Sequence, residues 1–292
     1  MERVGEKGPL AGIDSHTVLY GVFGDPVRHS KSPIMLNQAF REAGVNGVYA
    51  AFHVKPGELG DAVRGIRALG YRGVNVTIPH KVEVMKYIDE IDEGARLIGA
   101  VNTIVNEKGV LKGYNTDGIG YVRSLIEETG IALAGRSILV VGAGGAARGI
   151  VYALAKHNPG RIWIANRTKE RAIELAADFK AYGNIAGIGF DGIDDIGGSI
   201  DLVVNTTLVG MSPNVGESPI ETDWLTSAVT VSDIVYNPLK TELLKRAEAI
   251  GCRVHGGLGM FIYQGAYAFE YWTGLPAPVA AMRETVLQSM QA

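Results

Sequence analysis

Two residues that could transfer a proton stand in separate polar segments of the chain. Lys81 ends the segment Asn75-Val76-Thr77-Ile78-Pro79-His80-Lys81, and Asp117 lies in Asn115-Thr116-Asp117-Gly118. An ammonium and a carboxylate can work as a general acid/base pair if the fold brings them close, which their spacing alone does not show. Lys81 is predicted to start a helix, where its charge opposes the helix dipole. Because such violations of local rules concentrate at functional sites, we favour a functional role for Lys81.

Polar side chains that could bind a ligand occur in the same half of the chain. Ser30 and Ser32 follow the first predicted strand and lie at a helix start, where two hydroxyls could bind a carboxylate. Ser32 also fits the N-cap of that helix, so Ser30 is the more informative of the two. Asn75 and Thr77 alternate onto one face of a strand and can point at one ligand. Asn102 adds a further amide, although asparagine is also a common turn former.

A glycine-rich turn in the second half of the chain predicts a nucleotide site. The residues Gly142-Ala143-Gly144-Gly145-Ala146-Ala147 fit the dinucleotide fingerprint with alanine in its third position. They follow an apolar strand and open a helix, which is the context that the fingerprint requires. Glycine lets the backbone approach a pyrophosphate, and the helix N-terminus offers unpaired N–H groups. The alternative is a purely structural corner between strand and helix.

The residues after the next strand select the cofactor. An NAD site places a carboxylate about 20 residues beyond the glycine turn, to bind the ribose 2′-hydroxyl. This chain has Asn166-Arg167-Thr168 there, with Arg171 one turn later. Guanidiniums and a hydroxyl suit a 2′-phosphate, which a carboxylate would repel. NADP is therefore the expected cofactor, and solvated charges at a helix start are the alternative.

The elements that must position these residues alternate along the chain. Apolar runs predict strands at Thr17–Phe23, Val48–Val54, Gly73–Ile78, Val101–Asn106, Val110–Tyr114, Ser137–Val141, Arg161–Ala165, Leu202–Asn205, Val229–Asp233 and Arg253–His255. Helices are predicted from Ser32 to Gly44, at Glu58–Leu69, Lys81–Ile88, near Glu90–Ile98, from the residue after Gly118 to about Glu128, and at Ala146–His157, Lys169–Phe179, Thr241–Ile250, Phe261–Trp272 and Pro278–Met290. The first dozen residues are expected to form a loose extension.

This alternation predicts the α/β class with largely parallel sheets covered on both faces. We expect two α/β domains: an N-terminal substrate-binding domain over residues 1–117 and a Rossmann-type domain over 118–260. The helices of residues 261–292 are expected to pack back on the first domain, because no strand follows them. A length of 292 residues suits two domains.

Composition narrows the class of protein. A net charge of -3 gives no general attraction to nucleic acid or anionic lipid, and no apolar run is long enough for a membrane span or a signal peptide. The single cysteine, Cys252, excludes an intrachain disulfide and a thiolate metal cluster. A cytoplasmic globular protein with no metal is expected.

Taken together, the ordered motifs resemble the shikimate dehydrogenase family from about Tyr20 to Gly274. They comprise 24–33 (GDPVRHSKSP), 75–81, 100–103 (AVNT), 113–118, the glycine turn, 205–207 (NTT), 233–238 (DIVYNP), 257–260 (GLGM) and Gln264. Many members have histidine where this chain has Leu36, which we interpret as a helix-packing position.

The resemblance implies an oxidoreductase that uses NADPH to reduce 3-dehydroshikimate reversibly to shikimate, on the pathway to chorismate and the aromatic amino acids. It implies that Lys81 and Asp117 are the catalytic pair. The substrate-binding residues are expected to be Ser30, Ser32, Asn75, Thr77, Lys81, Asn102, Asp117, Tyr236 and Gln264. The NADP-binding residues are expected to be Gly142, Ala143, Gly144, Gly145, Ala146, Ala147, Asn166, Arg167, Thr168, Arg171, Ile234 and Gly257.

Two other functions stay open at this point. A related enzyme could oxidise quinate, often with NAD, although the two arginines argue against NAD. A dinucleotide-binding sensor without catalysis could keep the glycine turn, but it would have no need of the acid/base groups. The only partner expected is the small-molecule substrate; the oligomeric state stays open, with a homodimer among the options.

Overall fold

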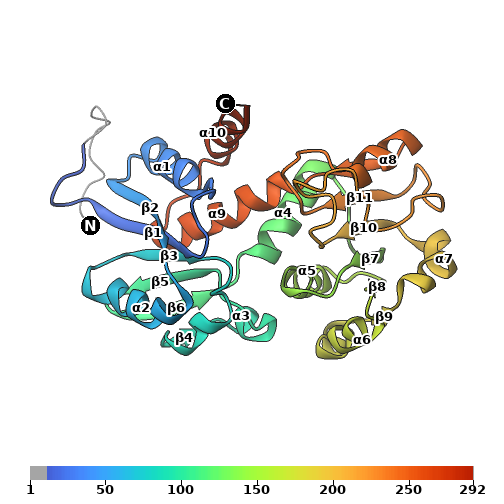
Figure 1. Ribbon diagram of the computed structural model, residues 1–292, viewed down its shortest axis with the longest axis horizontal. Coiled ribbons are helices and arrows are strands. Elements are labelled where there is room, and N and C mark those ends of the chain that lie inside the picture. The colour runs from blue at the N-terminus through green and yellow to red at the C-terminus, as the bar shows by residue number, and fades with distance from the viewer. Residues whose placement is uncertain (1–11, 292) are drawn as a thin grey trace. The chain divides into compact units, whose positions relative to one another are not determined.

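The computed structural model describes residues 12–291 of the chain (Figure 1). It divides into two compact units. Unit 1 comprises the segment up to Thr116 together with the segment from Gly265 onward, and unit 2 comprises Asp117–Gln264. The loose extension predicted for the first dozen residues falls almost entirely outside the described residues.

Unit 1 is built on one six-stranded sheet. In the order of the sheet its strands are β2 (Gly47–His53), β1 (Val18–Gly24), β3 (Gly73–Val76), β5 (Thr103–Glu107), β6 (Val110–Tyr114) and β4 (Glu90–Ile91). Its helices are α1 (Ser32–Glu42), α2 (Leu59–Ala68), α3 (Glu93–Ile98) and α10 (Val279–Gln291), and α9 (Leu258–Thr273) enters it from unit 2. Figure 1 shows α1 on one face of the sheet and α2 on the other, as expected for an α/β domain.

The sheet of unit 1 is mixed rather than largely parallel. β2, β1 and β3 run parallel, but β5 is antiparallel to both β3 and β6. The hairpin of β5 and β6 accounts for this change of direction, because a tight turn can join only antiparallel neighbours. The predicted hairpin is therefore correct, and the prediction of a largely parallel sheet holds for β2, β1 and β3 and for the pair of β6 and β4.

The predicted helix at Lys81–Ile88 is wrong. The structure has a turn at Lys81 and a short 3₁₀ helix at Glu83–Lys86. The apolar residues there do not follow a helical stripe: Val84 is fully buried while Val82 is 65% exposed. Such a short segment relies on tertiary packing rather than on helix propensity.

The segment from Gly265 onward completes the core of unit 1. Trp272 is buried beside the rings of Tyr20 and Tyr49, at centroid distances of 5.2 and 6.1 Å. Its indole N–H donates to the carbonyl of Ile104, at 2.9 Å. Lys31 Nζ reaches the carbonyl of Ser289 in α10, at 3.0 Å. The expectation that the C-terminal helices pack on the first domain is therefore confirmed.

Unit 2 is built on a fully parallel six-stranded sheet. Its order is β12 (Arg253–His255), β11 (Thr230–Asp233), β10 (Leu202–Asn205), β7 (Ser137–Val141), β8 (Arg161–Ala165) and β9 (Ile185–Ile188). Figure 1 shows α5 (Gly145–Ala155) and α6 (Lys169–Asp178) on one face and α8 (Glu242–Ile250) on the other. The strand order reverses beside β7, as in the Rossmann fold. β9 was not predicted from the sequence, and its four residues are only half buried.

α4 (Asp117–Thr129) opens unit 2 and packs closely on α5. A Cβ added at Gly118 would lie 2.1 Å from the carbonyl oxygen of Gly149, so only glycine allows this approach. The remaining short elements are α7 (Ile193–Ile196) and 3₁₀ turns at Pro56–Glu58, Lys180–Tyr182, Phe190–Gly192 and Gly197–Ser199.

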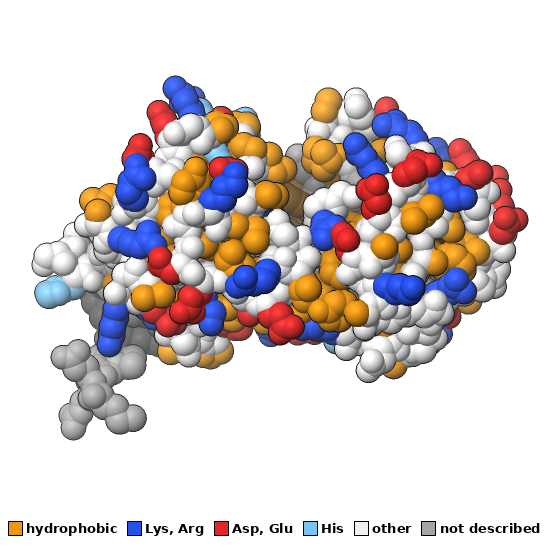
Figure 2. Space-filling view, turned by 90° about the horizontal axis from the view of Figure 1, so that it is seen from below, with side chains coloured by type: hydrophobic (Ala, Val, Ile, Leu, Met, Phe, Trp, Pro, Cys, Tyr) orange, Lys and Arg blue, Asp and Glu red, His pale blue; other side chains and the backbone are white. Residues whose placement is uncertain are grey.

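Charged side chains of both signs are intermingled on the face seen in Figure 2, in keeping with the small net charge. Within residues 12–291, no helix combines the length and the apolar character that a membrane crossing demands. The same residues contain no group of three or more His, Cys, Asp or Glu side chains arranged to hold a metal ion.

Candidate functional site

The two serines at the start of α1 have different roles from those predicted. The helix begins at Ser32, and Lys31 rather than Ser32 occupies the N-cap. The Ser30 hydroxyl accepts the backbone N–H of Ser32, at 3.2 Å, and so supports the helix start. The prediction of Ser32 as the N-cap is therefore wrong, because its own hydroxyl is a hydrogen-bond partner of Tyr49.

Tyr49 of β2 links Ser32 to β3. The Tyr49 phenol donates to Asn75 Oδ1 at 2.8 Å, and the Ser32 hydroxyl is a hydrogen-bond partner of the same phenol. Burial raises the pKa of the Tyr49 phenol well above its usual value, and the Ser32 hydrogen bond lowers it by less. The phenol is therefore a neutral donor that fixes the Asn75 carboxamide.

Asn75 uses both of its amide hydrogens inside unit 1. They go to the backbone carbonyl of Asn102, at 3.2 Å, and to Thr103 Oγ1, at 3.0 Å. Because Oδ1 already accepts from Tyr49, the group that Asn75 can offer to a ligand is the second lone pair of this oxygen. Asn75 is therefore suited to accept a hydrogen bond from a hydroxyl.

The same chain of hydrogen bonds continues to the end of unit 1. Thr103 Oγ1 donates to Asn102 Oδ1 at 3.0 Å, and Asn102 Nδ2 donates to Thr116 Oγ1 at 3.0 Å. The Thr116 backbone N–H returns to Asn102 Oδ1 at 2.9 Å. All three residues are buried. This network fixes the backbone immediately before Asp117, the first residue of α4.

Lys81 lies in the turn after β3 and is half buried. Contrary to the prediction, its charge does not oppose a helix dipole, because no helix begins at Lys81. Its backbone carbonyl accepts the N–H of Val101 at 2.8 Å, directly beside Asn102. This hydrogen bond and the peptide bond from Val101 to Asn102 thus connect the Lys81 backbone to Asn102, the residue that binds Thr116.

Thr77 follows β3 directly. Its N–H donates to the carbonyl of Phe23 at 2.9 Å, and its methyl group occupies the space that a Cβ at Gly24 would need. The ends of β1 and β3 are therefore joined at the same edge of the sheet that carries Asn75. In this unit the structure places Ser32, Asn75 and Asn102 in one hydrogen-bonded network, with Ser30 and Thr77 beside it.

The glycine turn of unit 2 has the geometry that a pyrophosphate site needs. Gly142 has a φ of +106°, and a Cβ there would lie 2.7 Å from Thr206 Oγ1. Gly144 and Gly145, at the N-terminus of α5, would meet no atom within 4 Å if they carried a Cβ. Ala147 is fully buried and packs the helix on the sheet. The first turn of α5 is thus accessible, and its N–H groups can bind an anion.

The residues after β8 supply the positive charge next to this turn. Asn166 donates from Nδ2 to the carbonyl of Thr168, at 2.9 Å, which shapes the start of α6. Arg167 and Arg171 are exposed, and no ion pair holds either guanidinium within residues 12–291. They are therefore available to an anionic ligand. These residues fit a 2′-phosphate, and the accessible glycines fit the pyrophosphate of the same cofactor.

The ends of β11 and β12 lie together at the carboxyl edge of the same sheet. A Cβ at Gly257 would lie 2.0 Å from the carbonyl oxygen of Ile234, so the two predicted nicotinamide contacts adjoin each other. Tyr236 stacks on Phe261 at a centroid distance of 5.1 Å, and burial raises the pKa of its phenol. Gln264 donates from Nε2 to the carbonyl of Phe261, at 2.9 Å.

Asp233 fixes the loop that carries Tyr236. Its carboxylate accepts from Asn205 Nδ2 at 3.0 Å, from Thr241 Oγ1 at 2.7 Å and from the Val235 N–H at 3.0 Å. Burial raises the pKa of Asp233 above its ordinary value, and these hydrogen bonds oppose the shift. The carboxylate therefore has a structural role at the edge of the sheet.

Sequence reasoning missed several residues of these networks, namely Tyr49, Thr103, Thr116, Asp233 and Thr241. Thr103 follows Asn102 and Thr116 precedes Asp117, so the sequence motifs that contain these predicted residues already pointed to both threonines. No sequence motif pointed to Tyr49, because its partners Ser32 and Asn75 belong to other elements.

Three family models match the chain. The model described as the shikimate dehydrogenase substrate binding domain matches residues 22–104. The model for shikimate / quinate 5-dehydrogenase matches residues 124–217, and the shikimate 5'-dehydrogenase C-terminal domain matches residues 257–287.

Known proteins match over nearly the whole length. A protein from Moorella thermoacetica named shikimate dehydrogenase (NADP(+)) is 49% identical over 284 residues, 96% of each chain. A crystal structure of a shikimate dehydrogenase with NADP+ has a TM-score of 0.89 at 44% identity and covers 97% of this chain and 99% of its own. A crystal structure of shikimate 5-dehydrogenase from Listeria monocytogenes, with shikimate and NAD, has a TM-score of 0.90 at 39% identity. It covers 95% of this chain and 99% of its own.

Proposed function

Because this chain belongs to the shikimate dehydrogenase family, we propose that it catalyses the reversible, NADPH-dependent reduction of 3-dehydroshikimate to shikimate. The observation that carries the proposal is the buried hydrogen-bond network from Ser32 to Thr116 in unit 1. A dinucleotide-binding sensor would need no such set of oriented hydroxyl and amide groups. Shikimate, which the enzyme oxidises in the reverse reaction, carries a carboxylate and several hydroxyls. The hydroxyl and amide groups of this network suit a carboxylate and hydroxyls alike.

Unit 1 is assigned to substrate binding and unit 2 to NADP binding. The domain boundaries expected from the sequence, after residue 117 and before residue 261, differ by one and four residues from those of the compact units. In unit 1, Ser30 and Ser32 bind the carboxylate, and Asn75, Thr77 and Asn102 bind ring hydroxyls. Tyr236 and Gln264 contribute to the surroundings of the substrate ring.

Unit 2 binds the cofactor along the carboxyl edge of its sheet. The N-terminus of α5 binds the pyrophosphate through Gly142–Ala147, and Asn166, Arg167, Thr168 and Arg171 bind the adenosine end. Ile234 and Gly257 bind the nicotinamide end. Bound NADPH supplies the hydride for this reaction. The carboxylate that an NAD site would place after β8 is absent from residues 166–168, which supports NADP.

Lys81 and Asp117 are the proposed catalytic pair. The Lys81 ammonium stabilises the negative charge that develops on the substrate oxygen and delivers a proton to it. Asp117 orients this ammonium and a substrate hydroxyl. The supporting contacts are those of unit 1: the Lys81 carbonyl binds the Val101 N–H, and the adjoining Asn102 fixes Thr116, which immediately precedes Asp117.

Initial rates test this proposal. Shikimate and quinate, each with NADP and NAD, should give the highest kcat/KM for shikimate with NADP. Lys81→Ala should lower kcat by about 100- to 10,000-fold with a much smaller change in KM, since general acid/base groups act mainly in the transition state. Lys86→Ala is the matched control: this exposed lysine pairs with Glu83, and its loss should leave kcat unchanged.

Asp117→Ala should cause a loss comparable to that of Lys81→Ala. The double variant should be little worse than the more damaging single variant, because residues that act as a unit are strongly non-additive. Near-normal turnover in a folded Lys81→Ala variant would remove Lys81 from the mechanism. A preference for quinate with NAD would replace the proposed substrate and cofactor.

For the cellular location we propose the cytoplasm. The thiol of Cys252 is buried and unpaired by any disulfide within residues 12–291, which is typical of a reducing compartment. Fractionation of cells with an antibody against the chain would test the location.

A further inference from the structure

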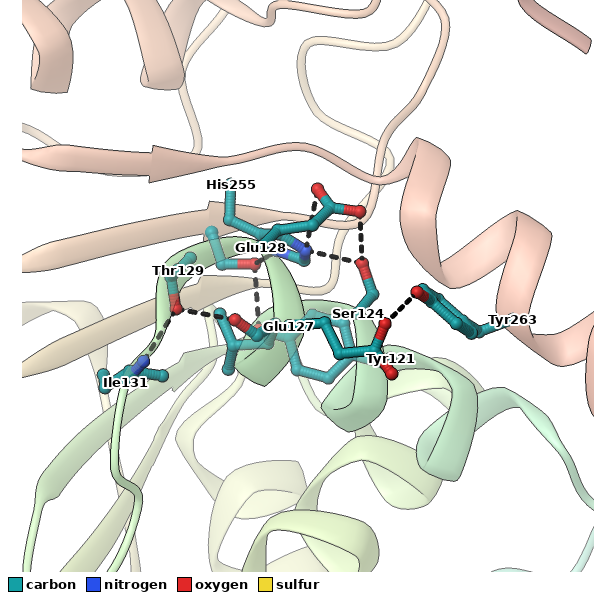
Figure 3. A network of polar contacts seen from close by, with 10 residues as sticks. Tyr121, Ser124, Glu127, Glu128, Thr129, Ile131, His255 and Tyr263 are labelled. Carbon is teal, nitrogen blue, oxygen red and sulfur yellow. Dashed lines mark hydrogen bonds and ion pairs between the residues drawn. The ribbon is translucent and has the colours of Figure 1, made fainter. Parts of the chain in front are cut away.

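A buried polar chain in unit 2 connects α4 to the last two strands of the sheet (Figure 3). The Tyr121 phenol donates to Ser232 Oγ of β11 at 2.9 Å, and Ser232 Oγ lies 2.8 Å from His255 Nδ1. His255 Nε2 lies 2.8 Å from Ser124 Oγ, which donates to Glu128 Oε1 at 3.1 Å. Tyr121, Ser124 and Ser232 are fully buried, and His255 is 2% exposed.

The directions of the hydrogen bonds around Ser124 follow from the donors available. A carboxylate only accepts, so the Ser124 proton points at Glu128 and the Ser124 oxygen accepts from His255 Nε2–H. The Ser232 oxygen accepts from the Tyr121 phenol and forms a second hydrogen bond with His255 Nδ1. His255 Nε2 also lies 3.7 Å from Glu128 Oε2, so the same ring nitrogen faces both Ser124 and this carboxylate.

Three residues of the chain share the face of α4 that begins at Asp117. Tyr121, Ser124 and Glu128 follow Asp117 at helical spacings of four, seven and eleven residues. At the other end of the chain, Ser232 and His255 each lie two residues before a predicted nicotinamide contact, Ile234 after β11 and Gly257 after β12.

The start of α9 packs against the same chain. A Cβ at Gly259 would lie 1.8 Å from Ser124 Oγ and 2.4 Å from Glu128 Oε1, so any other residue would displace these groups. Beside it, Tyr263 of α9 donates to Glu127 of α4, and the Arg123 guanidinium lies 4.9 Å from the Tyr263 ring centroid. Tight packing leaves α4 little freedom to slide along its axis.

We propose that His255 is a positioning residue for the reaction. By joining Ser124 to Ser232, it fixes α4 along its axis relative to β11 and β12, and so fixes Asp117 relative to the residues that bind the nicotinamide end. The inference rests on the proposed role of Asp117 in catalysis. His255 acts through α4 and has no contact of its own with substrate or cofactor in this proposed role.

The test compares His255→Leu with His255→Gln, which keeps a donor for Ser124. We expect His255→Leu to lower kcat by roughly tenfold to a hundredfold, because small displacements of reacting groups are costly. The KM for NADP should change by less than about twofold, and His255→Gln should recover part of the lost kcat. Tyr121→Phe removes one hydroxyl without opening a cavity, so it gives a folded variant if His255→Leu does not fold. Tyr152→Phe, at another buried tyrosine of unit 2, is its control and should have no effect.

A primary kinetic isotope effect separates positioning from loss of folded enzyme. With shikimate deuterated at the carbon that loses hydride, a smaller folded fraction lowers the rate and leaves the isotope effect unchanged. Misplaced groups slow the chemical step, so His255→Leu and Tyr121→Phe should raise the isotope effect. An unchanged isotope effect in both variants would overturn the inference.

A double-mutant cycle distinguishes failure of this inference from failure of the proposed function. In an Asp117→Ala background, His255→Leu should have little further effect on kcat. If Asp117→Ala is strongly impaired but the two losses multiply fully, His255 does not act through Asp117, and only the inference fails. If Asp117→Ala is as active as the wild type, the proposed role of Asp117 fails and the inference falls with it.

Discussion

Replacing Tyr49 by phenylalanine tests the hydrogen-bond network of unit 1. The change removes the only group that donates to Asn75 Oδ1 among the contacts described, and it leaves this oxygen in a side chain that is 6% exposed. An unsatisfied buried acceptor costs about 1–3 kcal/mol, so the free energy of unfolding of unit 1 should fall by that amount. Ser32 loses the phenol as a partner too, and the weakened orientation of Ser32 and Asn75 should raise the KM for shikimate.

The expected rise in KM is about threefold to tenfold, since one neutral hydrogen bond contributes about 0.5–1.5 kcal/mol. The KM for NADP should not change, because Tyr49 belongs to unit 1 and the glycine turn to unit 2. Turnover should fall less than in the Lys81→Ala variant, because Tyr49 carries no proton in the proposed reaction.

Tryptophan fluorescence during urea unfolding can report on unit 1 alone. Trp272 lies beside Tyr49, whereas Trp163 and Trp224 belong to unit 2 and can be replaced by phenylalanine in the background protein. Tyr20→Phe is the matched control: its ring contacts Trp272 in the same core, but its hydroxyl forms no hydrogen bond with any residue from 12 to 291. It should cost less than about 0.5 kcal/mol. Equal costs for the two variants, or an unchanged KM for shikimate in Tyr49→Phe, would refute the reasoning.

Three further predictions follow from the other contacts. Ser30→Ala should raise the KM for shikimate and, because its hydroxyl supports the start of α1, also lower the stability of unit 1 by about 1 kcal/mol, which thermal unfolding would measure. Arg167→Ala should raise the KM for NADP by roughly tenfold or more and leave that for NAD nearly unchanged; equal effects on both cofactors would reject the 2′-phosphate contact. Burial raises the pKa of Asp233 above the unfolded value, so the folded state holds its proton to higher pH and the contribution of Asp233 to stability decreases as the pH rises from about 4 through the folded-state pKa. Asp233→Asn should remove this part of the pH dependence, as urea unfolding at a series of pH values would show.

The sequence predicted the elements well where a local pattern specifies them. Strands Ser137–Val141 and Arg161–Ala165 fall exactly where apolar runs placed them, and the glycine turn lies between the first of these and a helix. Short segments were less predictable. The turn at Lys81 and the strand Ile185–Ile188 depend on neighbouring elements rather than on their own periodicity.

The networks around the candidate site could not be predicted at all from local patterns. Tyr49 and Asn75 are 26 residues apart, and Ser124 and His255 are 131 residues apart. Nothing in the spacing of such residues shows that they meet, because strand order and helix packing decide it. The prediction of Ser32 as an N-cap was wrong for the same reason. The Ser32 hydroxyl interacts with Tyr49, a tertiary partner, instead of capping the helix as a local rule predicts.

The way in which the chain closes unit 1 has a consequence for its synthesis. A ribosome completes the first segment of this unit, up to Thr116, long before it makes the segment from Gly265 onward. In the interval Tyr20 and Tyr49 lack the indole of Trp272, and α1 lacks its neighbour α10. Unit 2 is continuous in sequence and can fold in that interval. The nascent chain should therefore acquire a folded unit 2 first, while its earlier-made part stays open to chaperones until the segment from Gly265 onward emerges.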